Sequence, residues 1–493
     1  MRLHSVQYFI ILLSVLVSGH VSAVSATEKD STAVPDGFHY SVESGVTLSA
    51  GQHTPVWLVS NRHGLGSIRR NNGYLMGGFT YRSDIGGVVD YEIGTQLVGA
   101  CRFEAETFVR QMYFDMRWKQ LGIVVGSKIY QPELVNPELS SGELTYSGNA
   151  LPIPQVRAGL LDYFTVPGTR DWFAIKCHIA YGIFTDGRWQ RTFTRGRSAY
   201  ATKVLYHDKS LFVRVGNGRF PLTFEGGLEM PARFSGTLYE PGKRPVKIPH
   251  RFKDFWNILF PYKGDFETLP VDHNNILGDM LGSWNASLKW QLPTMSIRAY
   301  YEHQFTDHSQ LFFEYRWRDG MWGLEIELPR NPFVSTIVGE YIYSKDQTGP
   351  VYHDTDNIIP DQISGADNYY NHSTYSGWQH WGQAIGNPLF GSPVYNKNGD
   401  LNFRSNRIIA LHGGFCGDPD DRWHYRVLGS YVRHWGTYGN PLDEVLNVWT
   451  GMIEVTYRPR RYKAWKFSGA IAADKSTYIG NSLGGMITVT FSK

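Results

Sequence analysis

Short runs in which apolar and polar side chains alternate recur along most of the chain. Between residues 112 and 119, for example, Met112, Phe114, Met116 and Trp118 alternate with Tyr113, Asp115, Arg117 and Lys119. Successive side chains of a strand point to opposite faces, so this pattern predicts strands with one apolar and one polar face. In a barrel that crosses a membrane, the apolar face contacts lipid and the polar face lines the lumen.

The strand pattern extends from residue 37 to residue 493. The runs that carry it are 37–50, 55–61, 73–83, 88–102, 108–119, 121–131, 155–164, 172–185, 201–216, 221–234, 281–292, 295–306, 311–318, 321–329, 334–345, 404–417, 422–436, 448–460, 465–477 and 483–493. From these runs we expect roughly 18 or 19 spanning strands, and bacterial single-chain barrels have an even number. We therefore predict an all-β fold, a transmembrane antiparallel β-barrel of about 18 strands with long extracellular loops.

One segment has helical spacing. Its apolar side chains recur at intervals of three and four residues between Pro249 and Pro261, and they are Phe252, Phe255, Trp256, Leu259 and Phe260. This spacing predicts a short amphipathic helix over 251–260, bracketed by the two prolines. We expect it in a loop, packed against the barrel rather than serving as a partner site.

The first residues have the features of an export signal. Arg2 is followed by the apolar run 8–17, which is too short to span a bilayer, and by the small-residue cleavage site Val21-Ser22-Ala23. We predict a Sec signal peptide over 1–23, a flexible lead-in over 24–36 and a barrel domain over 37–493. After the signal, no stretch of about 18 apolar residues predicts a transmembrane helix.

Composition narrows the class of protein. Aromatic residues make up 15% of the chain, charged residues only 19%, and there are 52 glycines. Such a balance suits a large barrel with aromatic girdles in the bacterial outer membrane. The net charge of +3 implies no nucleic-acid partner. The three cysteines are an odd number, so at least one is unpaired or all are free.

The stretch 367–390 is the strongest candidate for a binding site. It reads D-N-Y-Y-N-H-S-T-Y-S-G-W-Q-H-W-G-Q-A-I-G-N-P-L-F and has neither strand nor helix periodicity. Long irregular connections are usually functional, and aromatic faces beside amides and imidazoles suit a ligand with many hydroxyls. The alternative is a loop cap whose aromatic rings simply pack on each other.

Two sets of side chains in this loop would bind a carbohydrate. The predicted stacking platforms are Tyr369, Tyr370, Tyr375, Trp378 and Trp381. The predicted hydrogen-bonding partners of sugar hydroxyls are Asp367, Asn368, Asn371, His372 and His380.

Catalytic and metal motifs are not found in the sequence. It contains no H-E-x-x-H, C-x-x-C or Walker pattern. Residues 354–357 begin like a calcium loop, but Ile359 occupies the position that needs glycine and no glutamate follows at position 12. We therefore expect no catalytic residues, no metal and no cofactor, and do not expect an enzyme.

Charged side chains alternate into the predicted lumen. They are Asp115, Arg117, Arg214, Arg298, Glu302, Glu340, Arg426 and Glu454. Opposite charges inside one barrel should form ladders that narrow or plug the pore. The alternative is a water-filled channel with individually solvated charges, and strand spacing does not decide between them.

Several stretches, taken in order, resemble the capsule assembly Wzi family in its Bacteroides-type form. They are T-P-V-W-L-V-S-N-R-H-G-L-G-S (54–67), N-G-Y-L-M-G-G (72–78), H-D-K-S-L-F-V-R-V-G (207–216), Y-Y-E-H-Q-F-T-D (300–307), D-G-M-W-G-L-E (319–325), E-Y-I-Y-S-K-D-Q-T-G-P (340–350) and the loop 367–390. The resemblance implies an outer-membrane β-barrel that acts as a lectin for the cell's own capsular polysaccharide, with outer loops that occlude the barrel. Some members carry a periplasmic helical bundle, for which this sequence has no obvious segment.

From these observations we expect a lectin-like protein of the bacterial outer membrane that binds capsular polysaccharide and anchors the capsule to the cell surface. Its expected partners are capsular or other surface polysaccharide and outer-membrane lipid, and we expect a monomer. Two alternatives stay open. One is a porin or diffusion channel, which needs an open lumen, and the other is an outer-membrane hydrolase, which needs an aligned nucleophile and base.

Overall fold

The computed structural model describes residues 36–260, 278–306, 317–329, 331–347 and 367–493. The predicted signal peptide 1–23, the lead-in apart from Asp36, the calcium-like stretch 354–357 and most of the run 311–318 lie outside the described residues.

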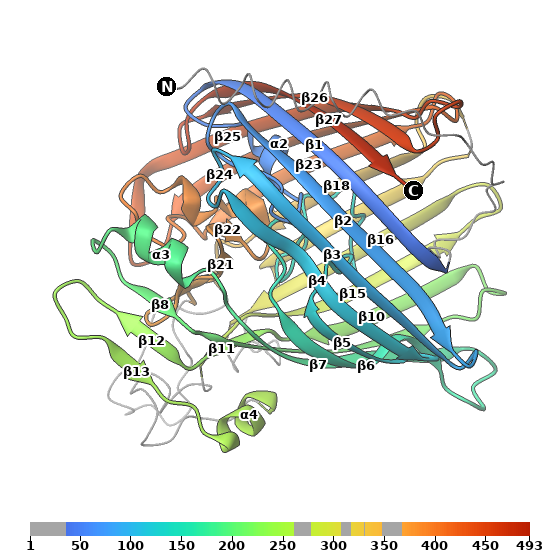
Figure 1. Cartoon of the computed structure of the whole chain (residues 1–493), viewed down its shortest axis with the longest axis horizontal. Coiled ribbons are helices and arrows are strands. Elements are labelled where there is room, and N and C mark those ends of the chain that lie inside the picture. The colour runs from blue at the N-terminus through green and yellow to red at the C-terminus, as the bar shows by residue number, and fades with distance from the viewer. Residues whose placement is uncertain (1–35, 261–277, 307–316, 330, 348–366) are drawn as a thin grey trace.

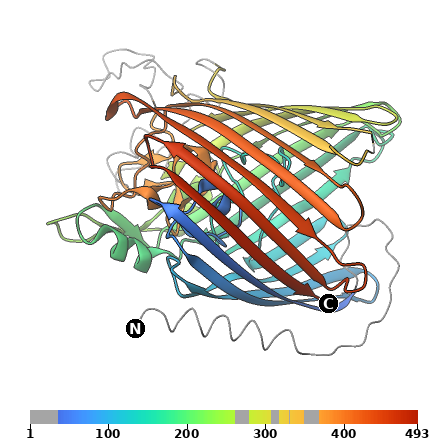
Figure 2. The ribbon, with the colours of Figure 1, turned by 90° about the horizontal axis from the view of Figure 1, so that it is seen from above.

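The strands close into one antiparallel barrel (Figures 1 and 2). The sheet has 20 segments, but β10 and β11 both pair with β9, and β14 and β15 are separated only by Leu281, so the barrel has 18 strands. The first strand pairs with the last, with Ser41 opposite Ser492, which leaves no open edge. The predicted fold class and strand number are confirmed.

The barrel strands, in chain order, are β1 (Gly37–Gly51), β2 (Asn72–Ile85), β3 (Val89–Cys101), β4 (Thr107–Trp118), β5 (Leu121–Ser127), β6 (Gln155–Thr165), β7 (Phe173–Ile183), β9 (Leu205–Val215), β10 (Leu222–Glu229) with β11 (Ala232–Phe234), β14 (Asp279–Met280) with β15 (Gly282–Gln291), β16 (Ser296–Phe305), β17 (Gly320–Glu327), β18 (Thr336–Tyr343), β23 (Ile408–Gly417), β24 (Trp423–Gly436), β25 (Pro441–Tyr457), β26 (Trp465–Ser476) and β27 (Ser482–Ser492).

The remaining elements lie in the loops. They are the helices α2 (Val56–Val59), α3 (Gly187–Thr194) and α4 (Phe252–Leu259), the small sheet of β8 (Tyr200–Thr202), β12 (Gly236–Tyr239) and β13 (Val246–Ile248), the short pairs β19 (Asn371–His372) with β20 (Ser376–Gly377) and β21 (Gln379–His380) with β22 (Gln383–Ala384), and the 3-10 turns η1 (Pro388–Phe390) and η2 (Pro393–Tyr395).

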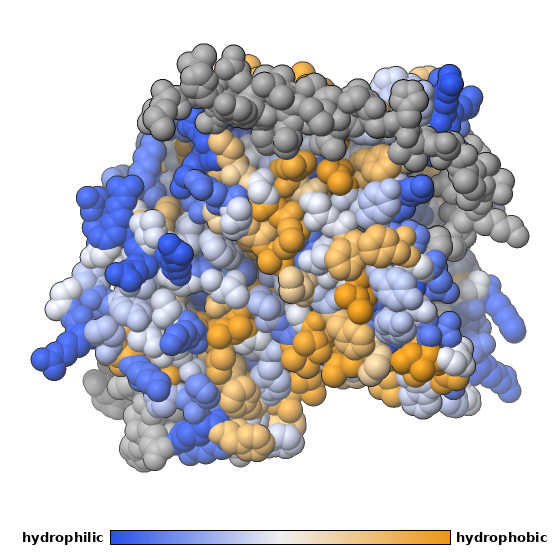
Figure 3. All heavy atoms as spheres, in the orientation of Figure 1, coloured by the Kyte–Doolittle hydropathy of each residue, from blue (hydrophilic) through white to orange (hydrophobic). Residues whose placement is uncertain are grey.

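The outer face of the barrel is apolar. On β4, Met112, Phe114, Met116 and Trp118 are exposed, whereas Asp115 between them is buried, as the alternation predicts. Figure 3 shows hydrophobic side chains gathered over the middle of the barrel wall. A closed barrel with such a surface is stable only with lipid around it, so the protein resides in the bacterial outer membrane. None of the described helices is long and apolar enough to span a bilayer.

The two ends of the barrel differ. One end carries short turns such as 86–88, 119–120 and 292–295 together with Gly37 and the C-terminus, and the other carries long connections such as 128–154 and 344–407. Outer-membrane barrels keep their short turns in the periplasm, so the long connections are extracellular.

Helix α4 confirms the predicted helix, but most of its predicted apolar stripe is exposed rather than packed against the barrel. Ile258 is buried on the outer face of the barrel wall with Met230, Phe234 and Phe305, and Lys209 Nζ donates to the Ile258 carbonyl at 2.8 Å. The predicted apolar stripe points mostly outward, because Phe252 and Trp256 are 92% and 64% exposed. The helix therefore packs on the lipid side of the barrel and extends its apolar surface.

The run 55–61 was predicted as a strand, and this prediction is wrong. Its centre forms the short helix α2, whose four residues are all buried inside the barrel. The Val56 amide donates to Asp474 Oδ2 at 2.9 Å, which fixes the helix to the wall. Periodicity cannot distinguish a buried helix from a buried strand in a short run whose residues are all apolar.

Charges in the lumen form ladders, as one of the two alternatives predicts. Arg426 Nε and Arg62 Nη2 both lie 2.9 Å from carboxylate oxygens of Glu454. Lys128 Nζ lies 2.7 Å from Asp115 and 3.1 Å from Glu92. The three cysteines are all free, so no disulfide crosses the barrel.

Candidate functional site

The extracellular half of the lumen is filled by three inward-folded segments, 52–71, 128–154 and 367–407. Their buried apolar side chains, Trp57, Leu58, Leu139, Leu144, Tyr370, Trp378, Phe390 and Phe403, belong to one core with lumen-facing side chains of the wall. This core explains why the chain has so many aromatic residues away from the lipid face.

Two wall carboxylates hold the segment 128–154 in place. Glu302 on β16 accepts hydrogen bonds from the backbone amides of Leu144 and Thr145 at 2.7 and 3.0 Å. Glu340 on β18 accepts from the Ser141 amide at 2.9 Å and from the Tyr300 hydroxyl at 2.6 Å. Backbone amides thus replace water as the partners of buried carboxylates.

The segment 367–407 packs on 128–154 in turn. Ser147 Oγ donates to the Gly386 carbonyl at 2.7 Å, and Asn387 Nδ2 donates to Ser141 Oγ at 2.9 Å. Tyr370, Ser376 and Trp381 adopt positive φ angles, so the chain reverses direction repeatedly instead of extending. These tight turns explain the missing periodicity of the sequence.

Most of the predicted stacking platforms are inside this core. Tyr369, Tyr370, Tyr375 and Trp378 are buried, and the Tyr370 ring centre lies 4.6 Å from that of Phe390. The Tyr369 hydroxyl donates to Asp319 Oδ2 at 3.0 Å. All four rings are enclosed by protein atoms. For these four residues, their burial favours the alternative reading, a loop cap whose aromatic rings pack on each other.

The predicted hydrogen-bonding residues also serve the loop itself. His380 is buried between the Leu151 carbonyl at 2.8 Å and Thr185 Oγ1 at 3.0 Å, and burial lowers its pKa. Asn371 exchanges two hydrogen bonds with the backbone of Phe403, Nδ2 to O at 2.9 Å and N to Oδ1 at 2.7 Å. His372 Nδ1 accepts from the Thr374 amide at 3.1 Å. Asp367 is half-buried and Asn368 is exposed.

Trp381 has a different environment from the other predicted residues. It is half-buried and lines an extracellular pocket of about 580 Å³ with loop 102–106, helix α3 and residues 396–399. Asp186 Oδ2 accepts from the Trp381 amide at 3.1 Å and fixes its backbone. The pocket therefore brings together one residue of the predicted site and several that the sequence analysis did not select.

Five cationic side chains surround this pocket against two carboxylates. The cations are Arg69, Arg188, Arg195, Arg197 and Lys397, and the carboxylates are Glu104 and Glu106. Arg69 Nη2 lies 3.2 Å from Glu104. No other described residue pairs with the guanidinium groups of Arg188, Arg195 or Arg197, and all three are exposed.

Aromatic rings form one wall of the pocket. Trp189 and Phe193, one turn apart on α3, stack with ring centres 4.8 Å apart. Trp189 Nε1 donates to Glu104 Oε2 at 2.9 Å. A Cβ at Gly382, whose φ is +83°, would come within 2.7 Å of the Trp189 ring, so glycine there permits the close approach of the loop. A sequence signal for this pocket exists. The stretch 188–197, R-W-Q-R-T-F-T-R-G-R, alternates arginines with aromatic residues.

The periplasmic half of the lumen has a second pocket of about 620 Å³. Its lining carries charged residues of both signs, which include Arg214, Glu225, Arg298, Glu325 and Lys289. Within the described residues, the inward-folded segments fill the extracellular side of the lumen, and only part of 128–154 reaches the periplasmic side, where this pocket remains open.

Comparisons with known proteins support the fold. No protein-family model matches the sequence, and no curated protein is detectably similar to it. Among solved structures, Wzi of Escherichia coli, an outer-membrane carbohydrate-binding β-barrel involved in group 1 capsule assembly, aligns with 91% of this chain and 84% of its own, with a TM-score of 0.55 and 11% identity. OprD of Pseudomonas aeruginosa aligns with 93% of this chain and 94% of its own, with a TM-score of 0.45 and 10% identity. OccK11 of the same organism aligns with 92% of this chain and 95% of its own, with a TM-score of 0.46 and 9% identity. At these identities, the likeness to Wzi describes a shared β-barrel architecture.

Proposed function

We propose that this outer-membrane protein binds a surface polysaccharide through its extracellular pocket and so holds a capsule on the cell. The observation that carries the proposal is the pocket itself, in which unpaired guanidinium groups stand beside stacked aromatic rings above a filled lumen. Aromatic faces contact the C–H faces of sugars, and guanidinium groups bind carboxylates and other anionic substituents. The likeness to a carbohydrate-binding barrel supports the same reading.

The charge balance makes an anionic polysaccharide the best-fitting ligand. Of the predicted residues, Trp381 keeps its role as a platform, with the half-buried ring of Phe193 beside it. Trp189 is buried and supports the pocket wall. Tyr369, Tyr370, Tyr375 and Trp378 instead support the pocket from below by packing the loop. The proposal assigns no catalytic step to the protein.

A binding measurement with the host's own capsular polysaccharide tests this. The triple variant Arg188→Gln, Arg195→Gln, Arg197→Gln should bind about tenfold more weakly, since each exposed cation contributes up to about 1 kcal/mol. The matched control changes Arg170, Arg219 and Arg461 to Gln, which removes the same charge from the periplasmic turns. Equal binding by both triple variants would contradict the proposal.

A diffusion channel is the second candidate, because the periplasmic half of the lumen is hollow and charged. A channel requires a continuous aqueous path through the segments that fill the other half. Steady large currents through the wild-type protein in a planar bilayer would favour this candidate over polysaccharide binding.

A further inference from the structure

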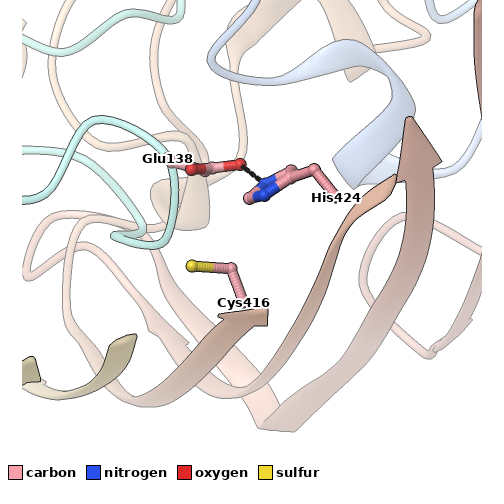
Figure 4. A group of neighbouring side chains, drawn as sticks. All are labelled: Glu138, Cys416 and His424. Carbon is pink, nitrogen blue, oxygen red and sulfur yellow. Dashed lines mark hydrogen bonds and ion pairs between the residues drawn. The ribbon is translucent and has the colours of Figure 1, made fainter. Parts of the chain in front are cut away.

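Three side chains with metal-binding atoms converge at the periplasmic end of the lumen (Figure 4). Glu138 belongs to the inward-folded segment 128–154, Cys416 lies near the end of β23 and His424 near the start of β24. One oxygen, sulfur or nitrogen atom from each lies within 4.8 Å of the other two. Cys416 and His424 both face the lumen, since their neighbours Phe415 and Trp423 are exposed on the lipid side.

The imidazole is already oriented toward the other two groups. Asp418 Oδ1 lies 2.8 Å from His424 Nδ1, which directs Nε2 toward Glu138 Oε1 at 2.5 Å. A carboxylate on the far nitrogen is the usual outer partner of a metal-binding histidine, because it fixes the tautomer and the ring plane.

The surroundings leave the carboxylate available. The nearby Arg426 directs Nε to Glu454 at 2.9 Å and Nη1 to the backbone carbonyl of Glu138 at 3.0 Å, so it does not neutralise the Glu138 side chain. Cys416 is buried, whereas Glu138 and His424 are half-buried, which gives an ion access from the periplasmic side.

We propose that Glu138, Cys416 and His424 bind a divalent transition-metal ion of the zinc class. One thiolate, one imidazole and one carboxylate suit zinc, which takes three protein ligands with a fourth position open to water. Binding releases the Cys416 thiol proton and the proton on His424 Nε2 to solvent, while Nδ1 keeps the proton it donates to Asp418. This differs from the expectation of no metal, because the three residues are distant in sequence and form no motif.

The ion would fasten the inward-folded segment to the barrel wall. Glu138 comes from that segment, and the other two ligands come from adjacent wall strands. Without a metal, the Glu138 side chain is joined to the wall by its ion pair with His424, beside the hydrogen bond that Arg426 donates to the Glu138 carbonyl. The experiment below separates the two cases. This inference is independent of the polysaccharide site, which lies at the other end of the barrel.

Cobalt absorption tests the proposal on the full chain, folded in detergent and stripped of metal with a chelator. Titration with Co²⁺ should produce a thiolate-to-metal charge-transfer band in the near ultraviolet that saturates at one equivalent and disappears when Zn²⁺ is added. Cys416→Ser should abolish the band, and Asp418→Asn should weaken Co²⁺ binding about 10- to 100-fold.

Cys101→Ser and Cys177→Ser are the matched controls, because they remove the other free thiols and should keep the band. Folding of each variant is checked by its heat-dependent gel mobility. If Cys416→Ser fails to fold, His424→Gln and Glu138→Gln replace it and should each weaken binding at least tenfold. Absence of the band in the wild-type protein, or its loss in Cys101→Ser with retention in Cys416→Ser, would overturn the proposal.

Discussion

Arg233 connects the barrel wall to the extracellular loop through a single guanidinium group. Its Nε donates to Asp279 Oδ2 at 2.9 Å, and its terminal nitrogens donate to the carbonyls of Gly377 at 2.7 Å and Ser376 at 3.0 Å. The group also lies 4.5 Å from the centre of the Trp378 ring. A residue of β11 thus determines where the loop turns.

Replacing Arg233 by methionine should destabilise the protein by about 3–5 kcal/mol, because Asp279 would remain as an unpaired buried charge. The measurement is unfolding in detergent, followed by gel mobility. Arg214→Met is the control, since its pair with Glu225 is more exposed and should cost less than about 1 kcal/mol. Adding Asp279→Leu to Arg233→Met should recover part of the loss, and no recovery would contradict this account.

We expect His63 to make the inward-folded segment 52–71 sensitive to pH. Burial, and then the positive charge of Arg110, lower the pKa of His63 to about 4. The unfolded segment takes up the proton near 6.5, so folded stability is complete above pH 6.5 and falls as the pH drops toward 4. The loss amounts to at most about 3 kcal/mol.

The prediction is that protease cleavage within 52–71 increases between pH 6.5 and 4.5 in the wild-type protein and increases less in His63→Gln. Comparing the two proteins at each pH cancels the effect of pH on the protease. An identical pH response of both proteins would show that His63 does not control the opening of this segment.

Residue composition predicts a loop rich in sugar-binding side chains but not which of them face solvent. Tyr370 and Trp381 are both aromatic residues of the same irregular stretch. Tyr370 is buried against Phe390 of its own segment and against Leu144 of the segment 128–154, which is far away in sequence. Trp381 instead lies at the pocket. A pattern of aromatic and amide side chains does not predict the arginines on and just after α3, because a guanidinium group belongs to neither class.

At the scale of the element, alternation predicts the barrel strands well because each has one lipid-facing and one lumen-facing side. It fails for 55–61, because all four residues of α2 are apolar and the spacing of apolar residues there does not distinguish a helix from a strand. It also leaves the orientation of α4 undetermined, because the buried anchor Ile258 lies outside the apolar stripe defined by Phe252, Trp256 and Phe260.

We expect Trp256 on α4 to lie in the outer leaflet of the membrane. Helix α4 packs against the lipid-facing wall through Ile258, and the indole of Trp256 is exposed. Tryptophan side chains favour the interface between lipid and water. The difference between the emission spectra of the wild-type protein and Trp256→Phe in vesicles should be blue-shifted and quenched by brominated lipid.

Trp381→Phe provides the comparison, because Trp381 lines an aqueous pocket. Its difference spectrum should be quenched by iodide and unaffected by brominated lipid. Quenching of the Trp256 emission by iodide alone would place α4 in water.

At the scale of the whole molecule, the barrel has a closed and an open half. The segments 52–71, 128–154 and 367–407 fill the extracellular half, and the pocket near Arg214 and Lys289 occupies the other. Charge alternation left two alternatives open, ion-pair ladders that narrow the pore and a water-filled channel. It could not show that backbone amides of inserted loops, rather than opposite charges alone, satisfy Glu302 and Glu340.

Replacing residues 132–150 by a short Gly-Ser linker should therefore create a conducting channel. The linker removes the amides that Glu302 and Glu340 bind and leaves these carboxylates in a wet lumen, so currents should rise and favour cations. Planar-bilayer recording measures this. The control introduces single Gly substitutions in the periplasmic turn 458–464, and it should leave the conductance of the wild-type protein unchanged.

The pairing of β1 with β27 has a consequence for biogenesis. The barrel cannot close until its last strand is available, so the first strand must wait with an unsatisfied edge while more than 400 residues are delivered. Contacts this distant in sequence form slowly. The cell must therefore keep the chain soluble in transit and guide its insertion, and loss of the final strand should direct the chain to degradation.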